Sequence, residues 1–297
     1  MRRTGRYSPL RYPGGKGKLA GYLKAIISEN SLNDGTYVEP FAGGAGIACE
    51  LLLENYVREI HINDLSPSIH CFWNSSLGET ERFCDDINAA KLTVEEWDRQ
   101  KLIFENERRS SSPDQYALGF ATFFLNRTNR SGILNGGIIG GRSQESEWGI
   151  DARFNRADLI DRIRLIASMN DRISVTSYDA LKLVKQLRKK NCFRTLMYLD
   201  PPYYEKGRQL YLDYYREDDH RKLAKAVQKD DQPFNWIVSY DNVQAIKSLY
   251  GNSRSFEYNI HYSARSASVG SEIIFFDRKL RIPTPEDHLK VTKRVAA

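Results

Sequence analysis

The segment Asp200-Pro201-Pro202-Tyr203 carries the clearest chemistry in the chain. It follows the apolar run Thr195–Leu199, which predicts a buried strand. The two prolines fix the backbone and remove two N–H donors, so a carboxylate, carbonyl acceptors and an aromatic ring remain. These groups suit an exocyclic amine on a planar ring. Acceptors that bond to the N–H groups weaken the conjugation of the amine with its own ring, and the tyrosine ring stacks on that planar ring. The alternative is that the two prolines only end the strand and that the tyrosine follows them by chance.

A glycine-rich turn at residues 41–46 and Asp64 form a second candidate site. Gly44-Ala45-Gly46 begins a near match to the dinucleotide pattern G-x-G-x-x-G/A, with Cys49 in the last place. Asp64 follows Gly46 by 18 residues, close to the spacing of an acid that binds ribose hydroxyls. The turn and the acid fit a dinucleotide or another nucleoside cofactor. A purely structural tight turn is the third interpretation.

Strand patterns alternate with helical patterns at both ends of the chain. The expected strands cover residues 36–39, 59–63, 173–176, 195–199, 236–239 and 272–276. This alternation predicts an α/β fold with a parallel sheet. Asp64, Asp179 and Asp200 follow three of these strands, and open α/β sheets bind ligands at the carboxyl ends of their strands. The acids therefore predict a nucleoside-type ligand at that edge, although Asp179 also stands where it would cap the next helix.

Residues 67–166 break the alternation, and helical patterns dominate there. Within them, residues 122–142 contain three arginines and no acid, with glycines and asparagines that predict a loop or hairpin. Arginine pairs with guanine edges and asparagine with adenine edges in the major groove of DNA. The candidates for DNA contact are Arg127, Asn129, Arg130 and Asn135. A solvated arginine-rich loop is the alternative.

The composition of the 297 residues bounds the class of protein. A formal net charge of +6 permits a polyanionic partner without demanding one. The sequence has no run of about 18 apolar residues and no apolar stretch behind its basic N-terminus, so we expect neither a membrane span nor a secretory signal. The four cysteines lie far apart, which predicts free thiols in a cytoplasmic protein. No histidine or cysteine stands at metal-ligand spacing, and we expect no bound metal.

Three motifs occur in an order that is typical of one family: Tyr12-Pro13-Gly14-Gly15-Lys16, Glu39-Pro40-Phe41-Ala42-Gly43-Gly44 and Asp200-Pro201-Pro202-Tyr203. Together they resemble the S-adenosylmethionine-dependent DNA adenine-N6 methyltransferases of the Dam-like D12 class, the alpha group. The resemblance extends over about residues 8–280. The chain departs from the family pattern at Tyr12, where tryptophan is frequent, and at Ala45, where many members have glycine.

The resemblance implies a Rossmann-like methyltransferase sheet with a mainly helical DNA-recognition insertion. The catalytic domain would comprise residues 1–66 and 167–282, the target-recognition domain residues 67–166, and a basic tail residues 283–297. The implied cofactor is S-adenosyl-L-methionine and the implied partner is double-stranded DNA. A cognate restriction endonuclease is a further partner if the protein serves restriction-modification.

The resemblance also implies roles for individual residues. The cofactor would be bound by side chains and backbone from several motifs: Tyr12, Lys16, Phe41, Gly43, Asp64, Asp179 and Asp200. In catalysis, Asp200 and the Pro201 carbonyl would accept hydrogen bonds from the N6 amino group, which favours the sp3-like amine of the transition state. Tyr203 would stack on the target adenine after that base flips out of the duplex.

Other functions fit parts of the pattern. An RNA adenine-N6 methyltransferase shares the 200–203 motif but has no need of a segment that reads a duplex. A cytosine-N4 enzyme usually has serine where Asp200 stands. Among other classes, a nucleotide-dependent dehydrogenase fits the glycine turn but leaves the 200–203 motif unexplained. A non-catalytic DNA-binding regulator has no need of a cofactor pocket.

Overall fold

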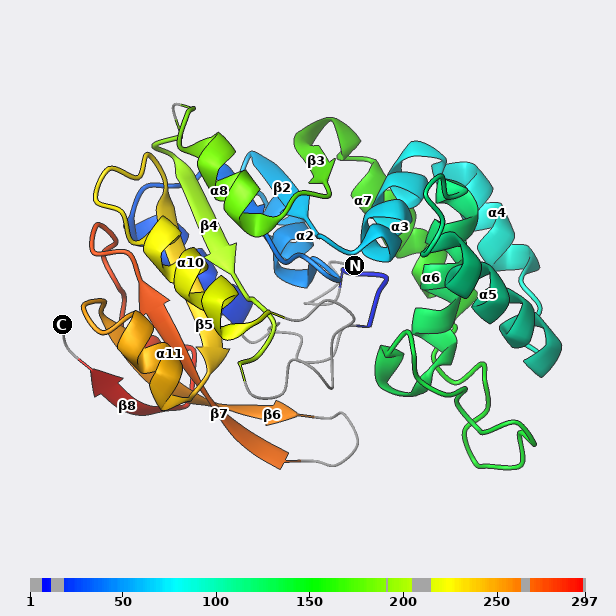
Figure 1. Cartoon of the computed structure of the whole chain (residues 1–297). Coiled ribbons are helices and arrows are strands. Elements are labelled where there is room, and N and C mark those ends of the chain that lie inside the picture. Colours follow the sequence, from blue (N-terminus) through cyan, green and yellow to red (C-terminus); the bar gives the residue numbers. More distant parts are fainter. Residues whose placement is uncertain (1–6, 12–18, 191, 205–214, 263–267, 296–297) are drawn as a thin grey trace. The chain divides into compact units, whose positions relative to one another are not determined.

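The computed structural model describes residues 7–11, 19–190, 192–204, 215–262 and 268–295 (Figure 1). The chain forms two compact units. The helical unit contains the N-terminal segment and Ser66–Asp171, and the sheet unit contains Lys16–Leu65 and the chain from Arg172 onward. The helical insertion thus begins and ends close to the predicted boundaries of 67 and 166.

The N-terminal segment belongs to the helical unit, whereas the sequence placed it in the catalytic domain. The backbone N–H of Arg11 donates to Asn126 Oδ1 at 2.7 Å, and Asn126 Nδ2 donates to the Arg11 carbonyl at 2.7 Å. Arg162 also donates to the Ser8 carbonyl at 3.0 Å. A side-chain amide that bonds to a distant backbone leaves no periodic signal, so the sequence pattern could not reveal this pairing.

One eight-stranded sheet dominates the sheet unit, in the order β3-β2-β1-β4-β5-β7-β6-β8. The five strands from β3 to β5 in this order run parallel, and β7, β6 and β8 continue the sheet with antiparallel pairing. The α/β class predicted from the alternation is therefore confirmed. The strands are β1 (Thr36–Glu39), β2 (Glu59–Asn63), β3 (Ile173–Thr176), β4 (Thr195–Leu199), β5 (Asn235–Asp241), β6 (Ser255–Tyr262), β7 (Ser268–Phe276) and β8 (Val291–Val295).

The strand order reverses between β1 and β4. From β1 the chain continues outward to β2 and β3, and β4 then returns to the other side of β1. In open α/β sheets the crevice beyond the strand ends at such a reversal is where ligands bind. The 200–203 motif follows β4 and the glycine-rich turn follows β1, so the topology places both motifs at this point.

Helices cover both faces of the sheet (Figure 1). Buried side chains from α8, α10 and α11 pack on one face with Val38, Met197 and Val238. Tyr22 of α1 packs on the other face, edge-on to Phe256 and Phe276 at 5.6 and 6.3 Å between ring centroids. The helices of this unit are α1 (Ala20–Glu29), α2 (Gly46–Leu53), α8 (Ala180–Leu187), α10 (Glu217–Val227) and α11 (Gln244–Leu249).

The C-terminal segment was predicted to be a basic tail, and this was wrong for its last part. Residues Val291–Val295 form β8, which pairs antiparallel with β6 at the edge of the sheet. The exposed positions Lys293 and Arg294 made this segment look like a tail. Charged side chains are, however, a common feature of edge strands, because they discourage pairing with other chains.

The helical unit packs around an aromatic core. Phe72, Phe83, Phe120 and Phe123 contact one another with centroid distances between 5.5 and 6.3 Å. The apolar residues 116–125 belong to α6, whose side chains from Leu118 to Asn126 are buried. No helix in the described part of the chain has the length and apolar character needed to cross a bilayer. The helices are α3 (Pro67–Gly78), α4 (Thr80–Ala89), α5 (Val94–Glu107), α6 (Gln115–Thr128) and α7 (Arg156–Ala167).

Candidate active site

Asp200 directly follows β4 and receives a hydrogen bond from the neighbouring strand. Ser239 Oγ of β5 donates to Asp200 Oδ1 at 3.1 Å. The hydroxyl groups of Tyr198 and Ser239 lie 2.7 Å apart, and both residues are buried. Because Ser239 has one hydroxyl proton and gives it to Asp200, Tyr198 is the donor in the second bond. A relay from Tyr198 through Ser239 therefore orients the carboxylate.

The rest of the 200–203 motif is held by β5 and β7. Tyr203 is 4% exposed, and its hydroxyl donates to Glu272 Oε1 at 2.7 Å. The next backbone N–H, that of Tyr204, donates to Asp241 Oδ1 at the end of β5 at 2.9 Å. These bonds fix both ends of the motif, because the Ser239 bond holds its first residue. Neither Ser239 nor Glu272 stood out in the sequence, since each is a polar residue next to the apolar run of its strand.

The glycine-rich turn and Asp64 are joined directly. The backbone N–H of Gly43 donates to Asp64 Oδ2 at 2.8 Å. Gly43 has φ 47° and Ala45 has φ 44°, so the turn uses the left-handed region twice. A residue with a side chain is uncommon there, so the conformation of Ala45 suits the glycine that the resemblance leads us to expect at this position. Phe41 of the turn is half-buried and packs edge-on against Tyr215 at 5.4 Å.

Asn63, which the sequence analysis did not single out, ties three strand ends together. Its Nδ2 donates to the carbonyls of Pro40 and Tyr178, both at 2.9 Å. Its Oδ1 accepts from Thr176 Oγ1 and from the Tyr178 N–H, both at 2.8 Å. The amide thus fixes the exits of β1, β2 and β3 beside Asp64. A buried polar residue immediately before a candidate acid is the signal that could have found it.

Glu39, the last residue of β1, is 5% exposed. Burial raises the pKa of its carboxyl group to about 8, and the negative charge of Asp200 contributes to this rise. Near neutral pH Glu39 is therefore mainly protonated.

Asp179 caps α8. Its Oδ1 accepts from the backbone N–H groups of Leu181 and Lys182 at 2.9 and 3.2 Å. The capping role predicted for this residue is confirmed, and its side chain is exposed. A carboxylate has about four acceptor sites, so capping leaves room for a ligand. Tyr12 and Lys16 lie outside the described residues.

Comparisons with known proteins agree with the motifs. A model of the D12 class N6 adenine-specific DNA methyltransferases matches residues 12–268. The chain belongs to this family. The predicted family and activity, DNA adenine-N6 methylation, are therefore confirmed, and the dehydrogenase and the non-catalytic regulator are set aside.

Individual relatives of this methyltransferase are distant. A type II methyltransferase of Methanocaldococcus jannaschii is 20% identical over 241 residues, which cover 75% of this chain and 80% of the relative. A solved structure from Pyrococcus horikoshii, provisionally described as an RNA methyltransferase, has 8% identity and a TM-score of 0.41, with 90% and 87% of the two chains covered. An S-adenosylmethionine-dependent methyltransferase of Agrobacterium tumefaciens has 9% identity and a TM-score of 0.38, with 89% and 63% covered. Similarity at these TM-scores is too low for conclusions.

Of the residues predicted to contact DNA, Asn129 has a structural role in the methyltransferase and Arg127 is only partly exposed. Asn129 is 0% exposed. Its Oδ1 accepts from Trp97 Nε1 at 2.7 Å, and its Nδ2 donates to the carbonyls of Ile133 and Leu134 at 2.9 and 3.0 Å. Arg127 is half-buried and bonds to the Arg153 carbonyl. The burial of Asn129 does not agree with the predicted contact to a base edge, because its amide closes the loop instead.

The other two residues of that segment lie at the surface. The backbone N–H of Arg130 donates to the Gly137 carbonyl at 2.9 Å, and Asn129 pairs antiparallel with Ile138. The predicted loop or hairpin is therefore confirmed for residues 129–138, whereas residues 122–128 of the predicted segment belong to α6. Arg130 and Asn135 are exposed on this loop, where side chains are accessible to a partner.

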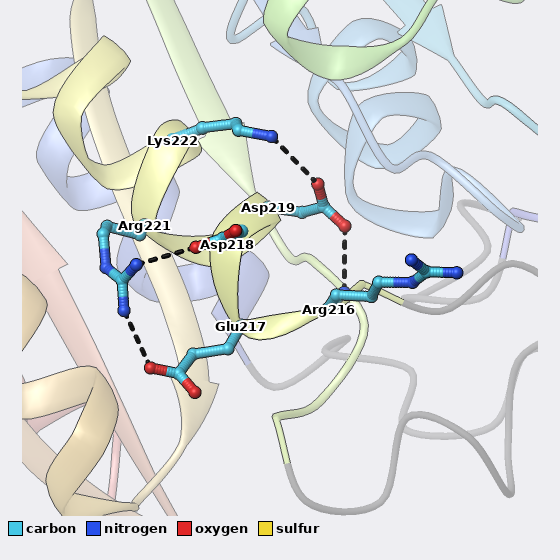
Figure 2. A pocket seen from close by; sticks show the side chains of 6 residues that line it. All are labelled: Arg216, Glu217, Asp218, Asp219, Arg221 and Lys222. Atoms are coloured by element: carbon cyan, nitrogen blue, oxygen red, sulfur yellow. Dashed lines mark hydrogen bonds and ion pairs between the residues drawn. The ribbon is translucent and has the colours of Figure 1, made fainter.

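Two shallow hollows in the sheet unit are lined by charged side chains. Figure 2 shows the hollow of about 420 Å³ at the start of α10, where Arg221 binds Glu217 and Asp218 at 2.8 and 2.7 Å. These charges neutralise one another, and the hollow contains none of the predicted site residues. The second, of about 390 Å³, runs along α8 and is lined by Asp179.

The cysteines and histidines have structural environments. All four cysteines are free thiols. His220 is buried and lies 2.9 Å from the Tyr240 hydroxyl, and burial lowers the pKa of this histidine to about 4. His61 bonds to Thr176 Oγ1 at 2.7 Å. Among the described residues, no three histidine, cysteine or acidic side chains gather in a way that would hold a metal ion.

Proposed function

We propose that this methyltransferase modifies N6 of an adenine that flips out of a specific site in duplex DNA, with S-adenosylmethionine as the methyl donor. The donor is consumed in each turnover and is therefore a co-substrate. The observation that carries the proposal is the orientation of Asp200. Its carboxylate follows β4 at the reversal of strand order and is held by the Tyr198–Ser239 relay.

The residues around β1 and β2 fit the nucleoside part of the donor. The Gly43 N–H donates to Asp64 at 2.8 Å, and a carboxylate is the type of group that accepts hydrogen bonds from ribose hydroxyls. Phe41 offers an aromatic surface beside this pair, and Asp179 lies at the exit of β3. By resemblance, Tyr12 and Lys16 would complete the site. When bound, the donor supplies a methyl group made electrophilic by its sulfonium.

Asp200 and the Pro201 carbonyl would act on the target amine. The N6 lone pair is delocalised into the adenine ring, and acceptors on the N–H bonds favour the sp3-like geometry that develops as nitrogen takes the methyl group. Hydrogen bonds that strengthen in the transition state raise the rate. As the new N–C bond forms and the C–S bond breaks, N6 loses a proton, and we assign Asp200 as its acceptor.

Tyr203 would hold the flipped base. Extrusion of a base from a duplex costs a few kcal/mol, and stacking on an aromatic ring returns roughly 1–3 kcal/mol. The ring is fixed in place by its hydroxyl bond to Glu272. A flipped adenine would therefore stack on a Tyr203 ring that needs little reorganisation.

The helical unit would hold the DNA through an arginine cluster, defined here as Arg11, Arg127, Arg153 and Arg162. Arg127 is crowded by the other three: burial lowers its pKa to about 9, and the charges of Arg11, Arg162 and Arg153 add to this effect. Asp158 binds Arg162 at 2.8 Å and offsets part of the charge. A DNA phosphate would relieve the remaining repulsion. Arg130 and Asn135, both exposed, are the candidates for base contacts.

A role in restriction-modification is supported by the name of one relative. The Methanocaldococcus jannaschii protein is a type II methyltransferase. We propose that this chain likewise protects a recognition site from a cognate endonuclease.

The proposal is tested by transfer of tritiated methyl groups to genomic DNA from a host without adenine methylation, followed by mapping of the modified adenines. We expect N6-methyladenine within one short sequence. RNA from the same host serves as the second substrate. Methylation of RNA alone, or of adenines without a common sequence, would contradict the proposal.

A further inference from the structure

Three side chains of the antiparallel half of the sheet lie in one row beside the 200–203 motif. Asp241 of β5 stands opposite Glu272 of β7, and Glu272 stands opposite Tyr258 of β6. Glu272 accepts from Tyr203 at 2.7 Å through Oε1 and from the Tyr258 hydroxyl at 2.5 Å through Oε2. Through its two oxygens, the Glu272 carboxylate thus links Tyr203 to Tyr258 of β6, a strand that is far from the motif in sequence.

If stability of the fold were its only purpose, this arrangement would be unfavourable. Glu272 is 0% exposed, and removal of a carboxylate from water is costly unless hydrogen bonds compensate. Its cross-strand neighbour Asp241 is also an acid, and like charges directly opposite each other destabilise a sheet. Apolar residues at these positions would pack without that cost. Instead, Glu272 accepts a hydrogen bond from the Tyr203 hydroxyl, and Asp241 accepts one from the N–H of Tyr204, the residue after the motif.

We propose that Glu272 is a positioning residue that, together with Tyr258, fixes the ring of Tyr203 for the target adenine. This inference rests on the proposed stacking role of Tyr203. Tyrosine has two side-chain torsions, and a ring anchored only at its Cβ can swing about both. A charge-assisted hydrogen bond at the far end of the ring removes this freedom before the base arrives. Tyr258 holds the second oxygen and so prevents rotation of the carboxylate.

Three variants separate positioning from stability: Tyr203→Phe, Glu272→Gln and Tyr258→Phe. Tyr203→Phe retains the ring and removes the anchored hydroxyl. Glu272→Gln retains the shape and removes the charge that strengthens both bonds. We expect each of these two to lower kcat for methyl transfer to DNA that carries the mapped site by roughly ten-fold. Tyr258→Phe leaves the bond between Tyr203 and Glu272 intact, so its effect on kcat is expected to be smaller.

The matched control is Glu257→Gln. Glu257 precedes Tyr258 on β6, so its side chain points to the opposite face of the sheet, where it binds Lys247 and Asn242, both at 2.8 Å. This substitution neutralises a carboxylate one position away without touching the 200–203 motif. We expect its kcat to stay within two-fold of the wild-type value. Equilibrium binding of S-adenosylmethionine and of DNA, and the melting temperature, are measured for every variant.

The decisive measurement is a double-mutant cycle with Tyr203→Phe and Glu272→Gln. If both substitutions act through the same bond, the double variant has about the same kcat as the slower single variant, with both binding constants unchanged. The inference is overturned if the two losses multiply, or if Tyr203→Phe retains wild-type kcat. Failure of the wild-type protein to methylate any DNA would instead contradict the proposed function, so the two failures are distinguishable.

Discussion

The 200–203 motif of the sheet unit and the 126–137 segment of the helical unit both contain residues with suitable chemistry, yet the structure treats them differently. Asp200 and Tyr203 are each held by a polar partner from a neighbouring strand. In the helical unit, Asn129 is buried and used for the fold, whereas Arg130, the next residue, is exposed. In the second segment, the residue types alone did not separate the buried Asn129 from the exposed Arg130.

The difference follows from the secondary structure that carries each segment. The end of a parallel strand always lies at the same edge of the sheet, so its side chains reach the ligand-binding edge whatever their rotamers. The other segment lies across the end of a helix: Arg127 is in the last turn of α6, Asn129 is extended, and Arg130 begins a short 3-10 turn. These three side chains therefore face different environments although they are close in sequence. The two regions can be separated by substitutions that change one and leave the other intact.

The largest expected effect belongs to the sheet unit. Asp200→Ala removes the acceptor of the N6 amine, and we expect kcat for methyl transfer to fall on the order of 10³-fold. DNA affinity, measured by fluorescence anisotropy with a labelled duplex, should stay within a few-fold of the wild-type value, because the proposed phosphate contacts belong to the helical unit. Retention of turnover would show that Asp200 is not the amine acceptor.

The helical unit gives the contrasting case of a polar residue that stabilises the fold. Asn129→Ala leaves Trp97 Nε1 and two buried carbonyls without their partner. We expect the free energy of unfolding to fall by about 2–3 kcal/mol, as measured by urea denaturation. Below the melting temperature the mapped methylation sequence should not change. An unchanged stability with an altered recognition sequence would restore Asn129 as a base-reading residue.

Much of the sheet could be predicted from sequence, because buried parallel strands are short apolar runs. The bounds of β1, β2, β3 and β4 agree with the predicted ranges. The edge strand β8 was not predicted, since its exposed polar residues lack the pattern of a buried strand. In the site, Asp64 and Asp200 could be found by their places after strands. Ser239 and Glu272 could not, because their roles depend on partners far away in sequence.

A third prediction concerns the protonation of Glu39 in the sheet unit. Burial raises the pKa of this carboxyl group to about 8, so between its ordinary value of 4.5 and 8 the folded protein binds a proton that the unfolded chain has released. Folding stability linked to this group is therefore fully present below pH 4.5 and is lost as the pH rises through 8. Glu39→Gln carries no such proton. Between pH 5 and 8, we expect the wild-type protein to lose on the order of 3 kcal/mol more stability than this variant.

The comparison with Glu39→Gln cancels other titrating groups, such as His61 and His220, because both proteins contain them. Urea denaturation at several pH values gives the difference directly. Parallel stability curves for the two proteins would mean that Glu39 is charged in the fold.

The smallest expected effect tests whether the arginine cluster binds DNA phosphate. Arg153 is its most exposed member, and each phosphate contact contributes about 0.9 to the slope of log affinity against log salt. Arg153→Gln should reduce that slope by about 0.9 and weaken binding to duplexes of any sequence alike. Arg142→Gln is the matched control, because the Arg142 guanidinium forms two bonds of 2.8 Å with Asp98 on the same unit. Equal slopes for Arg153→Gln and the wild-type protein would mean that DNA binding does not explain the crowding of positive charge around Arg127. A loss of affinity for one DNA sequence only would make Arg153 a base-reading residue.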